Sequence, residues 1–385
     1  MASDLSLSET AFGLGAGLFF IGYILFEVPS NLMLQRIGAR IWIARIMITW
    51  GVISAATFLV KTPMQLYILR FLLGVAEAGF LPGVLFYLTK WFPSWRRGRI
   101  IALFMIGLPL SSLIGGPLSG WIMSHFHDVY GLRGWQWLFL LEGLPSVLLG
   151  VITFWLLPDS VQSVSWLSDA EKKAIQTDLD KDNSTAKEIK HRLRDGLLNL
   201  RVLMLGGIDF SILLSANAMG FWMPTFIKHA GTTDIATIGY LTAIPSLAAV
   251  LGMLAIGRSS DRMRERRWHI IVPFNTGAIA MAASTFFAYN VVMIVLLFSI
   301  AQAMIIGAVP VFFSLPATFL TGTAAAAGFA LACSIANIAG LVSNSVMGIA
   351  LDLTGSGKGA LWFFAGCLLL SCLLVIALPA KLVNR

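Results

Sequence analysis

Long apolar runs recur along the whole chain and constrain its fold more than any other feature of the sequence. Each run has roughly 20 or more mainly apolar residues, the length at which an α-helix crosses about 30 Å of hydrocarbon. We therefore predict eleven membrane-spanning helices, at 11–34, 41–60, 66–88, 100–126, 136–157, 202–227, 236–256, 270–289, 291–315, 324–351 and 361–378.

The composition supports this assignment. Hydrophobic residues make up 57% of the chain and charged residues only 12%, whereas ordinary soluble domains have about 25% charged residues. The mean hydropathy is +0.83. The sequence therefore predicts an all-α fold, that of a polytopic helical protein in the plasma (inner) membrane.

Basic residues lie almost entirely on one side of the predicted bundle. That side has 22 of the 27 Lys and Arg residues, the other side has four, and Arg70 falls inside a span. Cytoplasmic loops accumulate Lys and Arg, so we predict a cytoplasmic C-terminus and, with an odd number of spans, an external N-terminus. The net charge of +8 then reflects orientation, and we expect no nucleic-acid partner.

The longest polar stretch, Pro158 to Arg201, separates five spans from six. Within it, Ser168 followed by Glu171 predicts the capped start of an amphipathic surface helix. NLMLQRIGARI at 31–41 and GRSSDRMRERR at 257–267 each follow a span and lead into the next, which suggests an internal duplication. The predicted parts are an N-terminal helical half at 1–157, a cytoplasmic central loop at 158–201 and a C-terminal helical half at 202–385.

Several strings together resemble the major facilitator superfamily, and within it the anion:cation symporters that import sugar acids, tartrate, and aromatic or hydroxyphenyl carboxylates with protons. The strings are GYILFEVPSNLMLQRIGAR (22–40), LRFLLGVAEAGFLPG (69–83), GWQWLFLLEGLPSVLLG (134–150), GFWMPTFIK (220–228), GRSSDRMRERRWH (257–269) and SIANIAGL (334–341). The resemblance covers essentially the whole chain. It implies two six-helix halves, alternating access, a monomer in membrane lipid, a small organic anion and protons as cargo, and no cofactor.

The chain departs from the family at its N-terminal end. Members have twelve spans, and the first has an embedded Asp-Arg pair followed two residues on by Asn. SDLSLSETAFGLGAG, at 3–17, resembles the loop between the first and second spans. We therefore expect eleven of the usual twelve spans here, either because the start was placed too late or because the protein is a natural truncation.

The string RFLLGVAEAGFLPG, at 70–83, puts two charges inside an apolar span. Arg70 and Glu77 are seven residues apart, so both project from one helix face, about 10 Å apart. A charge at mid-bilayer costs at least ~2.5 kcal/mol, so such residues face a water-filled cavity or a partner. Desolvation favours the neutral acid, which suits Glu77 to proton coupling with Arg70 attracting a carboxylate. Both positions match residues implicated in coupling in the resembling carriers; the alternative is a structural clamp between helices.

Uncharged polar side chains interrupt four apolar spans and are candidates for substrate binding: Tyr23, Asn217, Ser314 and Asn337. An unsatisfied amide or hydroxyl is costly in hydrocarbon, so these groups either bond neighbouring helices or line a cavity. Tyr23 and Asn337 match family positions that contact substrate. Asn217, Cys333 and Phe313 replace the tyrosine, asparagine and tryptophan that many members have, which favours a smaller or more apolar carboxylate than a sugar acid.

Three further carboxylates lie in or beside spans. Glu27 in EVPSN and Glu142 in LLEGLP are next to turns or span ends, where we expect structural roles. Asp209, in GGIDFS, stands where the family has an aromatic residue. We expect it to pair with Arg201 or another arginine at the cytoplasmic end; a second protonation site is the alternative.

The two loop motifs are expected to gate the carrier. In the second copy, Asp261 can cap a helix of the neighbouring half while Arg262 faces acidic groups and lipid phosphates. The first copy has Arg36 and Arg40 but Gln35 in place of the aspartate, so its latch should be weaker. GGPLSG at 115–120 is assigned to close helix packing and a kink.

Other functional classes fit less well. An enzyme needs clustered acids, bases or metal ligands, but the five histidines are dispersed, and His125 and His127 beside Asp128 are the nearest to a cluster. We expect no enzyme activity and no metal. A non-transporting remnant or sensor, and a drug/proton antiporter on the same fold, stay open as alternatives.

Overall fold

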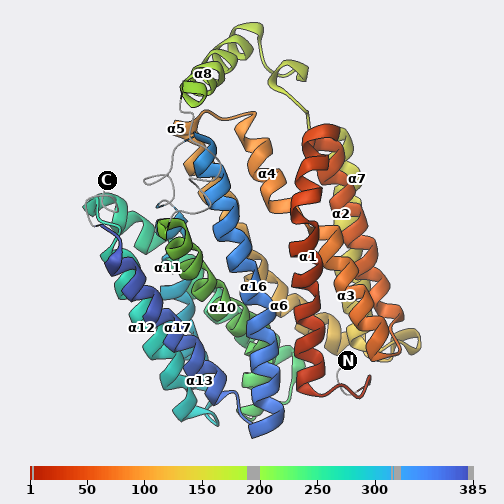
Figure 1. The fold of residues 1–385 in the computed structure, drawn as a ribbon. Helices are drawn as coiled ribbons and strands as arrows, with labels where there is room; N and C mark the ends of the chain where they lie inside the picture. Colours follow the sequence, from red (N-terminus) through yellow and green to blue (C-terminus); the bar gives the residue numbers. More distant parts are fainter. Residues whose placement is uncertain (2–3, 189–199, 314, 316–321, 380–385) are drawn as a thin grey trace. The chain divides into compact units, whose positions relative to one another are not determined.

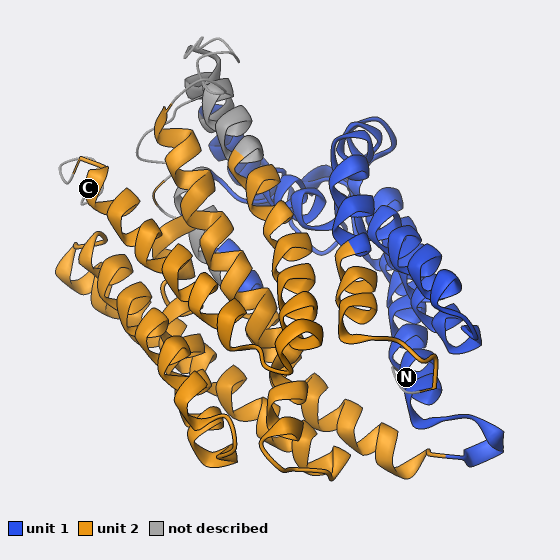
Figure 2. Ribbon diagram, turned by 60° about the horizontal axis from the view of Figure 1, so that its bottom comes forward, with its two compact units in different colours: residues 1, 18–105, 128–190 blue, residues 2–17, 106–127, 191–385 orange. Residues whose placement is uncertain are grey.

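The computed structural model describes residues 1, 4–188, 200–313, 315 and 322–379, and Figure 1 traces their helices in chain order. Within these residues the protein is helical and has no strand, and eleven helices are long and apolar enough to cross a membrane. This confirms the predicted all-α, eleven-span fold of a multi-pass membrane protein. The chain forms two compact units, described separately below (Figure 2).

Unit 1 consists of residues 1, 18–105 and 128–190. It contains the part of α1 (Glu9–Ile37) from residue 18 onward. Its other described helices are α2 (Ala39–Ala56), η1 (Thr57–Leu59), α3 (Pro63–Glu77), α4 (Phe80–Thr89), α5 (Ser94–Met105), η2 (Val129–Gly131), α7 (Gly134–Leu156), η3 (Val161–Ser163) and α8 (Asp169–Glu188).

Unit 2 consists of residues 2–17, 106–127 and 191–385. Besides the start of α1, its described helices are α6 (Gly107–His125), α10 (Leu200–His229), α11 (Ile235–Met263), α12 (Trp268–Ser284), η4 (Thr285–Phe287), α13 (Val291–Ile305), α14 (Val309–Phe313), α16 (Gly322–Thr354) and α17 (Lys358–Ala377). The units thus differ in extent from the expected halves at 1–157 and 202–385, because the start of α1 and all of α6 cluster with the C-terminal helices. The division into two six-helix halves stays a prediction.

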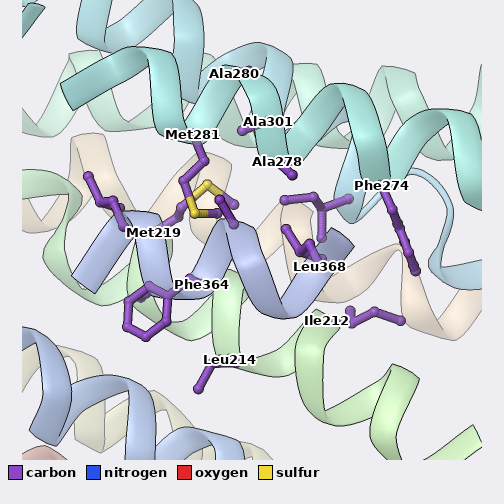
Figure 3. Packing of buried hydrophobic residues seen from close by; sticks show 14 of the residues in the cluster. Ile212, Leu214, Met219, Phe274, Ala278, Ala280, Met281, Ala301, Phe364 and Leu368 are labelled. Atoms are coloured by element: carbon purple, nitrogen blue, oxygen red, sulfur yellow. The ribbon is translucent and has the colours of Figure 1, made fainter. Parts of the chain in front are cut away.

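The core of unit 2 lies among α10, α12, α13, α16 and α17. Figure 3 shows part of it, with side chains from α10, α12, α13 and α17, such as Met219, Phe274 and Leu368. Ala278 and Ala301 are also buried here. Small residues at such contacts let helices approach closely, which is the main source of helix association in lipid.

Two contacts join the remaining helices of unit 2 to this core or to each other. The carboxylate of Asp352 on α16 accepts hydrogen bonds from the backbone N–H groups of Glu9 (3.0 Å) and Thr10 (2.7 Å), so it caps α1. α6 packs on α11, where a Cβ added to Gly116 would lie 3.0 Å from the carbonyl oxygen of Gly239. This packing agrees with the role predicted for GGPLSG.

The predicted surface helix is α8, and its start is capped as expected. The N–H of Ser168 donates to Glu171 Oε2 at 2.9 Å, and the N–H of Glu171 faces Ser168 Oγ at 3.4 Å. Ser168 Oγ also donates to Glu171 Oε2 at 2.8 Å, and the two bonds that Ser168 donates hold the pKa of Glu171 below its usual value. The pair is the reciprocal capping box that the sequence predicts.

Candidate functional site

The span expected at 66–88 is broken in its middle, directly after Glu77. α3 ends at Glu77 and α4 begins at Phe80. Ala78 is extended at ψ 128, and Gly79 has φ 86, in the left-handed region that favours glycine. Glu77 therefore ends a half-helix at a backbone break, an arrangement that carriers use at ion and substrate sites.

The face of α3 that carries Arg70 and Glu77 lies against α1. Gly74 is four residues after Arg70 and three before Glu77, so the three share one face. A Cβ added to Gly74 would collide with the carbonyl oxygen of Phe19 and lie 2.9 Å from the backbone nitrogen of Tyr23. The structure therefore brings three of the predicted site residues, Tyr23, Arg70 and Glu77, to one helix contact within unit 1.

The two charges of α3 do not pair with each other. Arg70 is half-buried, and its guanidinium carbon lies 5.8 Å from the ring centroid of Phe139 on α7, a cation–π contact. Glu77 is also half-buried. Among the described residues, neither side chain has a hydrogen bond or an ion pair, so both charged groups are left to interact with other species.

The break at Gly79 is packed against α1 by a serine that sequence reasoning missed. A Cβ added to Gly79 would collide with the hydroxyl of Ser30 and lie 2.8 Å from its Cβ. Ser30 is buried, and its Oγ accepts a hydrogen bond from Trp42 Nε1 at 2.9 Å. The Gly and Pro of GFLPG, inside an otherwise apolar run, were the available signal for this break.

The remaining candidates for substrate binding lie in unit 2. Asn217 on α10 is half-buried, and its Nδ2 donates to the carbonyl of Leu213 at 2.8 Å. Asn337 is half-buried on α16, the helix that packs most extensively on α10. Ser314 lies outside the described residues. Phe313 packs on Phe312 with ring centroids 5.4 Å apart.

The first loop motif is tied to the segment after α7. Arg40 forms an ion pair with Asp159, with Nε and Oδ2 3.2 Å apart, and its backbone N–H donates to Asp159 Oδ1 at 3.3 Å. Arg36 is exposed in the last turn of α1. Asp159 is 119 residues from Arg40, so neither spacing nor periodicity pointed to this pair.

In the second loop motif, the capping residue within unit 2 is Glu265. Its carboxylate accepts from the N–H of Trp268 at 2.8 Å and from His269 Nδ1 at 2.8 Å. Partial burial acts to raise the pKa of Glu265, but the hydrogen bonds from Trp268 and His269 outweigh it and hold the pKa below its usual value. Asp261 and Arg262 are exposed at the end of α11, and their gating role stays a prediction.

Asp209 corrects an expectation. Its side chain on α10 is 3% exposed. Within the described part of the chain the carboxylate has neither an ion pair nor a hydrogen bond, so the expected ion pair with Arg201 does not form; Arg192 and Arg194 lie outside the described residues. Eight residues separate Asp209 from Arg201, about 12 Å along the helix, and that distance was too long for the proposed contact.

Comparisons with known proteins give one consistent family. The model described as Major Facilitator Superfamily matches residues 1–334. "Putative metabolite transport protein NicT" of Pseudomonas putida is 72% identical over 385 residues, covering 100% of this chain and 88% of that protein.

Two further relatives cover nearly the whole chain. A "Putative tartrate transporter" of Agrobacterium vitis is 42% identical over 378 residues, 98% of this chain and 84% of that protein. A "Quinolone resistance transporter" of Acinetobacter baumannii is 41% identical over 383 residues, 99% of this chain and 88% of that protein. Among solved structures, a D-xylose-proton symporter aligns with a TM-score of 0.76 at 17% identity, over 98% of this chain and 89% of that one, and so shares the fold.

Proposed function

Because the chain belongs to the major facilitator superfamily and is a membrane transporter of metabolites rather than an enzyme, we propose that it imports a small organic carboxylate by proton symport. The observation that carries this proposal is the arginine and the glutamate on one face of a broken span, against α1 at Tyr23. The relative named as a putative tartrate transporter supports an organic anion as substrate.

Arg70 is the group that attracts the anion. A guanidinium inside a membrane span costs at least ~2.5 kcal/mol, and among the described residues its one contact of opposite polarity is the π face of Phe139. A ring face does not neutralise a cation as a carboxylate does. Arg70 therefore has a full positive charge and a planar, two-pronged donor for a substrate carboxylate.

Glu77 is the proton carrier of the proposed cycle. An inside-negative potential opposes anion uptake by ~2.3 kcal/mol per charge per 100 mV, and cotransported protons cancel that opposition. Glu77 ends α3 at a backbone break, so a change in the angle between α3 and α4 alters its access to water. Its neutral form is favoured while it is enclosed and its ionised form when water reaches it.

By the sequence prediction, hydrogen bonds to the substrate come from Tyr23, Asn337, Asn217 and Ser314. The amide of Asn217 uses one N–H on its own helix, which leaves a second N–H and the oxygen for a ligand. The polar set is small and the neighbouring Phe312 and Phe313 are apolar. This composition favours a compact or partly apolar carboxylate.

The proposed orientation places the protein in the inner membrane with the N-terminus of this chain outside and the C-terminus in the cytoplasm. The protein works as a monomer, because one chain of this fold contains a whole transport path. Arg36 and Arg40 on one loop, and Asp261 and Arg262 on the other, then lie on the cytoplasmic side, where they latch one conformation. The pair between Arg40 and Asp159 supports a fixed position for the first loop.

Drug/proton antiport is the second candidate, favoured by the relative named as a quinolone resistance transporter. Proteoliposomes separate the two. The protein is reconstituted and supplied with tartrate, an aldarate, an aldonate or hydroxyphenylacetate under an inward proton gradient. Uptake of at least one carboxylate that depends on the gradient supports the proposal. Transport of a quinolone or another cationic or neutral drug, with none of the carboxylates, overturns it, and a chain that binds no panel compound overturns it in favour of a non-transporting remnant or sensor.

An arginine variant sharpens this test. Arg70→Gln removes the charge-assisted hydrogen bonds, which are each worth about 1.5–3 kcal/mol, so we expect KM for the carboxylate to rise roughly 10- to 100-fold. Lys61→Gln, at an exposed loop residue of the same unit, is the matched control and should leave KM unchanged. Equal KM values in the two variants would show that Arg70 does not bind the carboxylate.

A further inference from the structure

Asp209 is a buried carboxylate that has no part in the proposed roles of Arg70 and Glu77 in unit 1. It lies on α10, about 14 Å along the axis from the helix start at Leu200. Asp209 lies inside a membrane span, and only 3% of the residue is exposed. Other parts of the protein therefore cover it. Its helix packs on α16 and α17 within unit 2.

α10 is closely packed by apolar groups of two other helices on the turn that contains Asp209. A Cβ added to Gly206 would lie 2.9 Å from Ile335 Cδ1 on α16, and one added to Gly207 would lie 3.2 Å from Leu374 Cδ1 on α17. Ile208 and Ile212, on either side of Asp209 in the sequence, are buried as well. The surroundings of Asp209 are therefore closely packed and apolar.

Asp209 differs from the neighbouring buried serines of α10, which are satisfied by their own helix. Ser211 Oγ donates to the carbonyl of Gly207 at 3.0 Å, and Ser215 Oγ donates to that of Ser211 at 3.0 Å. Asp209 has no such partner among the described residues. An ionised carboxylate in that position would lose its hydration without compensation, so the enclosed state favours the protonated acid.

Among the described residues of α10 and of the helices that pack against it, no nearby group offers a counter-ion to Asp209. α13 has no titratable residue. The titratable residues of α10, besides Asp209, are Arg201, Lys228 and His229. Those of the other helices that pack on α10 are Cys333 and Asp352 on α16, Lys358, Cys367 and Cys372 on α17, and Tyr240, Arg258, Asp261 and Arg262 on α11. Lys358 is 16 residues from Leu374, about 24 Å along α17. Arg258 and Arg262 are exposed at the end of α11, and thiols are not cations.

We propose that Asp209 is a second proton-binding site, which takes up a proton when α10, α16 and α17 enclose it and releases the proton when they separate and admit water. The inference rests on the proposed function, since it supplies a second coupling proton to the same transport cycle. Unit 2 would then have a titrating group of its own, Asp209, in addition to Glu77 in unit 1. Two protons per cycle would make uptake of a dicarboxylate electroneutral and uptake of a monocarboxylate electrogenic.

The proton-to-substrate ratio tests this proposal. Proteoliposomes are held at zero membrane potential with valinomycin and equal potassium on both sides, and steady-state accumulation is measured against the pH difference. Each coupled proton contributes one tenfold factor per pH unit, so the unaltered protein should accumulate substrate about 100-fold per unit. Asp209→Asn should accumulate it about 10-fold, and the double variant with Glu77→Gln should not accumulate it. Substrate counterflow at equal pH should persist in all three.

Two matched variants act as controls. Asp209→Glu keeps a carboxyl group and should restore the steeper dependence on pH. Ser211→Ala removes a neighbouring buried polar group that bonds only its own helix, and it should accumulate substrate like the unaltered protein. If Asp209→Asn keeps the full ratio, the inference is wrong while the proposed function stands. If the unaltered protein shows no dependence on the pH difference for any carboxylate, the proposed function itself fails.

A measurement without substitution covers the case in which Asp209→Asn does not fold. Dicyclohexylcarbodiimide modifies protonated carboxyl groups in apolar surroundings, and peptide mass mapping locates the product. Modification of Asp209 that declines as pH rises supports the proposal. Absence of modification at Asp209 at every pH, with Glu77 modified in the same sample as the internal reference, contradicts it.

Discussion

At the scale of single residues, Glu77 is the proposed coupling residue of unit 1, and its substitution gives the most direct prediction. Glu77→Gln has nearly the same shape as the protonated acid but cannot release a proton. We expect accumulation driven by a pH difference of one unit to fall at least about tenfold, with counterflow intact. Glu171→Gln, on the exposed face of α8, is the control. A Glu77→Gln protein that concentrates substrate with the usual pH dependence would disprove the assignment.

Glu265 gives a prediction about stability and pH outside the membrane spans. The hydrogen bonds from Trp268 and His269 hold the pKa of its carboxyl below the usual value. A lowered folded-state pKa means that the carboxylate stabilises the folded loop above the unfolded pKa, and that this stabilisation is lost as pH falls through the folded pKa. Glu265→Gln should therefore lower the Tm near neutral pH. The gap from the unaltered protein should close as the pH falls through the folded-state pKa of Glu265, and a gap that stays constant over this range would refute the argument.

At the scale of elements, the sequence predicted the features that depend on the average hydrophobicity of a segment or on a local capping pattern. It missed the features that depend on the backbone conformation of one or two residues or on contacts between distant residues. All eleven spans follow from apolar runs of about 20 residues, and the start of α8 follows from Ser168 and Glu171. The break between α3 and α4 was missed because it depends on the backbone dihedral angles of two residues, Ala78 and Gly79. The pair between Arg40 and Asp159 was missed because it joins residues far apart in the chain.

The candidate site follows the same division. Arg70 and Glu77 stood out because charges are rare in apolar spans, and their shared helix face followed from their spacing. Their approach to Tyr23 depends on the contact of Gly74 with the backbone of α1, which no pattern within one helix encodes. The burial of Asp209 likewise depends on how α10 packs against other helices, where Ile335 and Leu374 lie against Gly206 and Gly207.

The helix break at Gly79 gives the prediction at this scale. Gly79→Ala places a Cβ at a left-handed φ, which costs roughly 1–2 kcal/mol, and drives it into Ser30. We expect a lower Tm in detergent and loss of proton-driven uptake, because Glu77 would shift with the end of α3. Gly107→Ala is the matched control, since nothing lies within 4 Å of its added Cβ; it should be neutral or slightly stabilising. Equal effects in the two variants would show that the break is not needed.

At the scale of the whole molecule, charge asymmetry and helix count together predict the membrane orientation that the other proposals assume. By the predicted spans, twenty-two basic residues belong to one side and four to the other. Inserting the chain the opposite way would move the larger set across the membrane, against the bias that orients short loops. With this orientation α3 begins on the external side and ends at Glu77. α4 then continues from the break toward the cytoplasmic side.

Exposed aromatic residues on opposite sides of the spans allow this orientation to be measured. Tyr289, between α12 and α13, is 89% exposed, and Trp166, between α7 and α8, is 69% exposed. Each is changed to cysteine in a protein whose three native cysteines are replaced by serine or alanine, and intact cells are treated with a membrane-impermeant maleimide. Tyr289→Cys should react directly, whereas Trp166→Cys should react only after permeabilisation, because the segment that contains it belongs to the basic, cytoplasmic side. The reverse pattern would invert the topology, and with it the side from which Glu77 takes up its proton and Arg70 its anion.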